Sequence, residues 1–336
     1  MTETAPSTAN RLDNTVKAIG LVTLSYLLNT FSDAALKWVL PEVGSAGAMF
    51  WRGCFGALSV LLLGQSWRRG ALATLRPHNG WLLFGRGAFN CLVSLLYYVA
   101  WTRGMSLVDT YVVAATTPLI LTVMAVPLLG EKVGWRRWTS TTVGLAGVLF
   151  MLQPGGALWR PESLLMLLAV TLLAVTRIWT RMLARTDRPE SIAFWLMVAQ
   201  ILGGIASYPF FPAEHFIPRP TTLLLLAMCS MFYGFMHFTI ARAYAMAPVS
   251  VLAPIEYSPI LWGLGLGLAI WGELPSWTTI IGAVVVIAAG LFNLHRERVR
   301  LNSQRIASEA LAMPGPATPP RPVTTPLPPP ARARAS

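Results

Sequence analysis

The sequence contains very little charge for its length. Of its 336 residues, 12% are Asp, Glu, Lys or Arg, whereas 54% are hydrophobic. Soluble domains carry about 25% charged residues, so this chain is too apolar to consist of ordinary soluble domains. A bilayer core about 30 Å thick needs about 20 apolar residues per helix, and most of residues 16–294 divides into segments of that length. The sequence therefore predicts an all-α membrane protein embedded in the lipid bilayer.

Cysteine and histidine are also scarce. The three cysteines all lie in apolar segments, and their odd number argues against a disulfide framework. The four histidines are scattered along the chain, and the motifs HExxH, GxSxG and the P-loop are absent. No carboxylate cluster has metal-ligand spacing. We therefore expect no metal site, no resident cofactor and no enzymatic activity. The sequence also argues against an ATP-driven pump, because such a pump would need a nucleotide-binding domain.

Charged and proline-rich breaks divide the apolar region into ten expected spans. In sequence order they are 16–36, 45–64, 80–102, 107–129, 137–153, 162–183, 190–211, 221–243, 248–271 and 277–294. In membrane proteins the cytoplasmic loops are enriched in Lys and Arg, so a missed span would place basic loops on the wrong side of the membrane. With both termini cytoplasmic, the only basic residues in the external loops are Lys37, Arg103, Arg160 and Arg219. The net charge of +12 is thus an orientation signal, and no nucleic-acid partner is needed to explain it.

Residues 104–150 and 245–292 repeat one pattern of prolines, glycines and tryptophans. The matching positions are Pro118 with Pro259, Gly130 and Glu131 with Gly272 and Glu273, and Trp135 with Trp277. Because each half has five spans, an odd number, the second copy enters the membrane from the opposite side. Such inverted repeats serve alternating access in transporters. The predicted fold is therefore ten transmembrane helices arranged as two inverted five-helix repeats.

The chain divides into four expected parts. Residues 1–15 form a polar N-terminal segment, 16–155 the first five-helix repeat, and 156–296 the second, inverted repeat. Residues 297–336 form a Pro/Ala/Arg-rich cytoplasmic tail. From about residue 303 the composition cannot bury enough apolar surface to fold, so we expect the tail to be disordered.

Three segments resemble a known family. They are FSDAALKWVLPEVGSAGAMFWRGCFGAL (31–58), TPLILTVMAVPLLGEKVGWRRW (117–138) and YSPILWGLGLGLAIWGELPSW (257–277). They are similar to EamA-type carriers of the drug/metabolite transporter superfamily over residues 16–296. The resemblance implies a ten-helix carrier whose central cavity is lined mainly by the first, third, fourth, sixth, eighth and ninth helices. Residues 242–263, with Glu256 and Tyr257, are most similar to the branch containing riboflavin and S-adenosylmethionine carriers.

Apart from charges at the membrane boundary, five charged side chains fall inside the expected spans. Each costs roughly 3 kcal/mol or more unless it has a partner, lies in a water-filled cavity or is functional. Asp33 and Arg52 lie near the outer ends of their helices and can pair. Arg86, Arg177 and Glu256 each lie about 10 Å from the inner face. Three arginines against two carboxylates leave one positive charge for an anionic substrate. The alternative is that all five are structural pairs or extend to the inner surface.

Polar residues at helical spacing also indicate a wet central site, since residues three, four or seven apart share one helix face. Aromatic rings could add stacking surface for a planar ligand. The candidate substrate-binding residues are Asn29, Asp33, Arg86, Asn90, Tyr97, Thr116, Thr117, Arg177, Trp179, Tyr233, His237, Glu256 and Tyr257. For any one of them, an interhelical hydrogen bond or a place at the membrane interface is the alternative interpretation.

These observations favour a secondary transporter of a small organic metabolite in a bacterial inner membrane. The metabolite would be amino-acid-like, a vitamin or a nucleotide-like cofactor. The alternatives are a polytopic membrane enzyme, a channel or a scaffold without carrier activity. Gly263 and Gly267 form a GxxxG motif that permits close helix contact, either within the bundle or in a homodimer.

Overall fold

The computed structural model describes residues 8–63, 75–129, 135–152, 161–183, 186–212, 217–246, 255 and 257–312. Within these ranges every regular element is helical and none is a strand, so the predicted all-α class is confirmed. Residues 1–296 and 297–336 form two separate compact units.

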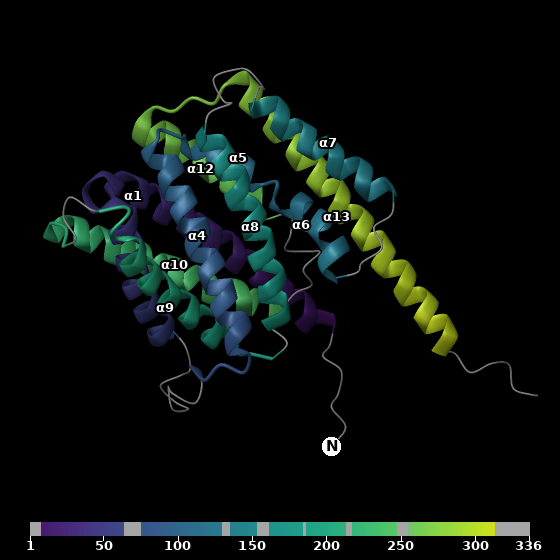
Figure 1. Ribbon diagram of the computed structural model, residues 1–336. Coiled ribbons are helices and arrows are strands. Elements are labelled where there is room, and N and C mark those ends of the chain that lie inside the picture. The colour runs from purple at the N-terminus through teal and green to yellow at the C-terminus, as the bar shows by residue number, and fades with distance from the viewer. Residues whose placement is uncertain are drawn as a thin grey trace, which may run out of the picture. The chain divides into compact units, whose positions relative to one another are not determined.

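The helices coincide with several of the expected spans and depart from others. In order they are α1 (Thr8–Leu63), α4 (Gly80–Thr102), α5 (Leu107–Ala114), α6 (Thr117–Leu129), α7 (Trp135–Leu152), α8 (Pro161–Leu183), α9 (Pro189–Ser207), α10 (Pro220–Met246), α12 (Ser258–Trp271) and α13 (Trp277–Ala312) (Figure 1). Five apolar segments are long enough to cross a membrane, namely Val16–Leu62, Gly80–Thr102, Pro161–Thr180, Pro189–Ser207 and Pro220–Ile240. The apolar part of α1 has 47 residues, about twice the length that one crossing needs.

Helix α1 contains both of the first two expected spans, separated by a kink. Pro41 lies inside the helix, and Gly44 has φ 64° and ψ 171°, which is not a helical conformation. Glycine adopts a positive φ without the steric cost that a Cβ would impose. The chain therefore changes direction between residues 36 and 45, where the sequence predicted the loop.

The expected span 107–129 is divided into α5 and α6. The break at residues 115–116 is followed by Pro118 in the first turn of α6, a position at which proline loses no helical hydrogen bond. The hydroxyls of Thr116 and Thr117 donate to the carbonyls of Val113 and Ala114, at 2.6 and 2.5 Å. These two threonines thus bond to the backbone at the break.

The end of α13 corrects one expectation. We expected a disordered tail over 297–336, but the helix continues to Ala312. Residues 297–312 are rich in the helix-forming residues Ala, Leu, Glu and Arg, and the first proline after them is Pro314. Proline content, rather than polarity, therefore decides where this helix can end. Residues 313–336 lie outside the described part of the chain.

Glycines bring α1 into close contact with α9 and α10. A Cβ added to Gly204 would lie 2.6 Å from the backbone nitrogen of Phe50, and one added to Gly234 would lie 2.6 Å from the carbonyl oxygen of Gly56. Real Cβ atoms do not approach backbone so closely. Small residues at membrane helix contacts permit this backbone approach. The second part of α1 is consequently packed tightly against two helices of the second half.

The predicted GxxxG motif packs within the bundle. Gly263 faces the ring of Tyr111, and a Cβ on Gly267 would lie 3.3 Å from the side chain of Val108. Both contacts are made to α5, on the opposite half of the sequence. Helices α7 and α13 also lie side by side, since Gly147 of α7 faces Val285 of α13 (Figure 1).

Candidate functional site

A buried ion pair joins the two parts of α1. The Asp33 Oδ1 atom accepts from the NH2 group of Arg52 at 2.7 Å, and the two residues are 9% and 5% exposed. The second carboxylate oxygen, Oδ2, accepts from Asn29 Nδ2 and from the Tyr111 hydroxyl, both at 3.0 Å. Every oxygen of this carboxylate is therefore committed to protein donors.

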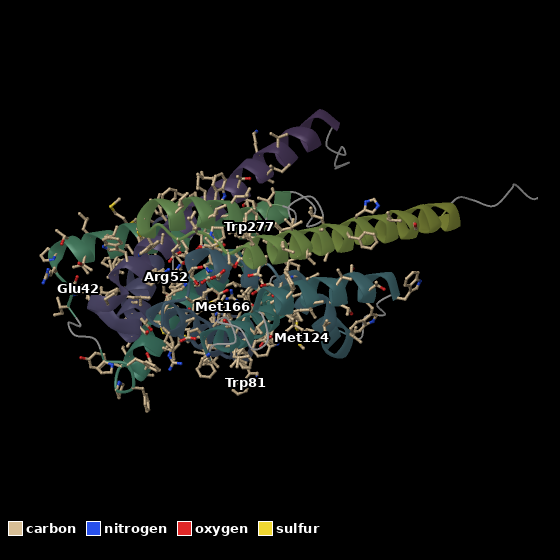
Figure 2. All side chains as sticks on the ribbon, turned by 90° about the horizontal axis from the view of Figure 1, so that it is seen from above. Glu42, Arg52, Trp81, Met124, Met166 and Trp277 are labelled. Atoms are coloured by element: carbon tan, nitrogen blue, oxygen red, sulfur yellow. The ribbon has the colours of Figure 1, made fainter. Side chains whose placement is uncertain are left out.

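Arg52 extends this cluster to helices α4 and α10. Its NH1 group donates to the Tyr98 hydroxyl at 3.2 Å, and its guanidinium lies 3.7 Å above the centre of the Tyr233 ring. Figure 2 shows Arg52 among the helices, whereas Trp81 lies at their margin. A cation over a desolvated aromatic ring adds about 2 kcal/mol of attraction. The positive charge of Arg52 is thus matched by a carboxylate and an aromatic face.

His237 is the next polar group along α10. Its ring meets the Tyr233 ring edge to face, with the centroids 4.6 Å apart. Its Nε2 atom is buried and has no hydrogen-bond partner among the described residues. Arg52, Arg86 and Arg177 all lie close enough to act on the imidazole electrostatically. His237 therefore lies where positively charged groups from α1, α4 and α8 converge.

Arg86 connects α4 to α8 and α9 and is 5% exposed. Its Nε–H donates to the Thr180 hydroxyl at 2.7 Å, and its NH1 group donates to the Ile192 carbonyl at 3.2 Å. One turn away, Phe89 packs against Trp179 with the ring centroids 4.9 Å apart. A guanidinium and an aromatic pair thus occupy the same region between α4 and α8.

Gln200 of α9 is a polar residue that the sequence analysis missed. It is completely buried, and its Nε2 group donates to Asn90 at 2.9 Å and to Ser94 at 2.8 Å. Its Oε1 atom is buried without a partner among the described residues. Asn90 and Ser94, one turn apart on α4, thus find a common hydrogen-bond donor on α9. The sequence did offer a signal for Gln200, because a single glutamine in an otherwise apolar span indicates a polar contact inside the bundle.

A second ion pair lies at the end of the bundle that is expected to face outward. Lys37 Nζ lies 2.6 Å from Glu273 Oε1 and 4.6 Å from the centre of the Trp271 ring. Glu273 Oε2 accepts from the backbone N–H of Leu107 at 2.9 Å, at the start of α5. These bonds connect α1 and α5 of the first half to the loop after α12. The sequence analysis did not include this pair, because it set charges at the membrane boundary aside.

The remaining candidates are more dispersed. The Tyr97 ring meets the Trp101 ring edge to face, with the ring centroids 6.0 Å apart. Tyr97 also interacts electrostatically with Asp33, Arg177 and Tyr233. The side chains of Thr116 and Thr117 bond to the backbone at the α5–α6 break. Tyr257 is buried with its hydroxyl against Gly290 of α13. Glu256 lies outside the described residues. Within the described part of the chain no three His, Cys, Asp or Glu side chains gather to hold a metal ion.

Long apolar helices around buried polar residues define a multi-pass membrane protein. The EamA-like transporter family matches residues 16–153 and again residues 160–294. The chain belongs to the EamA-like transporter family, which confirms the resemblance to drug/metabolite transporters. It is therefore a membrane transporter and not an enzyme.

Several similar proteins are named for the molecule they transport. The S-adenosylmethionine uptake transporter of Rickettsia prowazekii (strain Madrid E) is 26% identical, over 84% of this chain and 93% of the relative. The riboflavin transporter of Rhizobium johnstonii (strain DSM 114642 / LMG 32736 / 3841) is 29% identical, over 79% of this chain and 86% of the relative. A solved crystal structure is also similar, with a TM-score of 0.59 and 19% identity over 82% of this chain and 97% of that one. This last likeness concerns the fold alone.

Proposed function

We propose that the protein is a secondary carrier that moves a small organic metabolite across a bacterial inner membrane by alternating access. The ten spans would form two inverted five-helix repeats, with both termini in the cytoplasm. The observation that carries this proposal is the buried polar site between the halves, to which α1 and α4 contribute from one half and α8 and α10 from the other. The family's double match, once to each half, supports the repeat.

The substrate class follows from the relatives and from the side chains present. S-adenosylmethionine and riboflavin both combine a flat heterocycle with polar groups, and the relatives named for them match most of this chain. Trp179 with Phe89 offers aromatic surface, and Arg86 and His237 offer polar groups beside it. Aromatic stacking combined with a few convergent polar atoms is typical of small-molecule sites. A vitamin, a nucleotide-like cofactor or an amino-acid-like metabolite is the substrate that this site favours.

The network around Glu273 supports a conformation that is closed at the outer end. Lys37 and Leu107 of the first half both donate to this one carboxylate of the second half. Close by, the Thr279 hydroxyl of α13 donates to Asp109 of α5 at 2.9 Å. In an alternating-access carrier the two halves must separate at this end when the site opens outward. These hydrogen bonds would then break and form again once in each transport cycle.

The first test is ligand binding by the purified full-length protein, followed by transport. Thermal unfolding is measured with S-adenosylmethionine, flavins and amino acids, since a ligand that binds the native state stabilises it as the logarithm of its concentration over Kd. Any stabilising compound is then tested for uptake into proteoliposomes. Saturable uptake with counterflow is expected of a carrier. Uptake that does not saturate would indicate a channel, and the absence of both binding and uptake would favour a scaffold.

A further inference from the structure

Two ion pairs link charged side chains in the described part of the bundle, and Arg86 belongs to neither. Asp33 pairs with Arg52, and Glu273 at the outer end pairs with Lys37. The Arg86 guanidinium donates to a hydroxyl and to a backbone carbonyl, which are both neutral, and no carboxylate of the described ranges forms an ion pair with it. A buried guanidinium without a counter-charge is costly in a membrane. Among the described residues Arg86 thus has no counter-charge, which favours an anion supplied by another molecule.

Other groups around Arg86 also favour an anion. Arg177 lies close enough to interact with Arg86 electrostatically, and both act on His237. The Nε2 atom of His237 is buried with its hydrogen-bonding capacity unused among the described residues. Buried polar atoms are almost always hydrogen-bonded, so this one indicates a partner other than the described residues, and a bound ligand can be that partner. Arg86 and His237 thus approach one region from α4 and α10.

An aromatic surface adjoins this positive region. Trp179 packs on Phe89, and a Cβ added to Gly85 would lie 3.5 Å from the Trp179 ring. Gly85 and Phe89 lie within one turn of Arg86 on α4, so the Trp179 ring of α8 packs on α4 close to the position of Arg86. A ligand that places a heterocycle on Trp179 would hold a polar substituent within reach of Arg86.

We propose that Arg86 binds an anionic group of the transported molecule, a carboxylate or a phosphate, and that His237 donates or accepts a second hydrogen bond to it. This inference rests on the proposed transport function and makes it more specific, because it requires the substrate to carry a negative group. Arginine suits this task since its planar fork matches the geometry of both anions. The substrate then supplies the counter-charge that Arg86 lacks within the described ranges.

The test uses ligand pairs that differ only in the anion. One pair is S-adenosylmethionine and its decarboxylated analogue, and the other is riboflavin 5′-phosphate and riboflavin, so a carboxylate and a phosphate are examined separately. Binding to the purified full-length protein is measured by thermal shift and titration calorimetry. A charge-assisted hydrogen bond predicts at least about tenfold tighter binding of the anionic member of one pair. Arg86→Gln should reduce that preference to less than about threefold, whereas Arg86→Lys should retain part of it.

Arg76→Gln provides the matched control, because Arg76 is exposed and precedes α4. It should leave the preference unchanged. Equal binding of the charged and uncharged members by the unaltered protein would overturn the inference and leave the transporter proposal intact. An unchanged preference in folded Arg86→Gln would likewise overturn it. If no member of either pair and no other metabolite binds or is transported, the proposed function fails and the inference fails with it.

Discussion

Asp33 and Arg52 allow a double-mutant cycle on a buried ion pair inside a membrane bundle. Asp33→Asn leaves the guanidinium of Arg52, which is 5% exposed, without its counter-charge. Removing one partner of a buried pair costs about 3–5 kcal/mol, because the other charge stays buried and uncompensated. Arg52→Gln should cost a similar amount, since the carboxylate then keeps only the neutral donors Asn29 and Tyr111.

The double variant carries neither charge and should therefore be more stable than either single variant. Stability is measured by denaturant unfolding in mixed micelles, and the coupling is the difference between the double effect and the sum of the single effects. A coupling of about 2 kcal/mol or more is expected from the 2.7 Å contact and its burial. Losses that add within about 0.5 kcal/mol would refute the reasoning, because the two side chains would then be energetically independent.

Three further predictions follow from individual contacts. Glu273→Gln removes the anion that holds Lys37 and weakens the acceptor for the first N–H of α5, so deuterium uptake around residue 107 should rise in hydrogen-exchange mass spectrometry. Gly204→Leu should separate α9 from α1 and so prevent folded protein from accumulating, which size-exclusion chromatography measures. Gly265→Ala is the control and should be tolerated, because nothing lies within 4 Å of the added Cβ. His237→Phe keeps the ring contact and loses the orphaned nitrogen, so ligand affinity should fall about tenfold with little change in thermal stability.

Each of these predictions has a clear contrary result. Exchange that stays unchanged near residue 107 but rises throughout the chain would mean that Glu273 supports global stability rather than the outer contact. Normal yields of Gly204→Leu would contradict the close helix approach. A His237→Phe protein that unfolds more easily while binding normally would assign His237 to packing alone.

The sequence predicted the helices better than the contacts between them. Helix α4 has the expected bounds, 80–102, because charge and a capping Asn79 punctuate a long apolar run. An interruption at Pro118 was predictable, but its form was not, since a proline in an apolar run is equally compatible with a fixed kink and with a new first turn. The start of α12 was expected near residue 248, and residues 247–254 lie outside the described structure.

For the site, a pairing between the two charged residues of neighbouring spans was predictable and the pairs across the bundle were not. Asp33 and Arg52 lie at similar depth on consecutive helices, which sequence spacing alone indicates. Gln200 reaches Asn90 only because α9 packs on α4, which no local pattern encodes. Lys37 and Glu273 are 236 positions apart, so their contact depends on how the two halves pack.

The glycine contacts of α1 with α9 and α10 restrict which parts of the molecule can move. Where Gly204 and Gly234 bring backbones together, no layer of flexible side chains separates the helices, so sliding or rotation would force rigid backbones into collision. This seam should behave as one solid body. Hinges are then expected in segments whose helices are already interrupted, such as the α5–α6 break beside Pro118. In a transport cycle these segments would move relative to the rigid contact that α1 makes with α9 and α10.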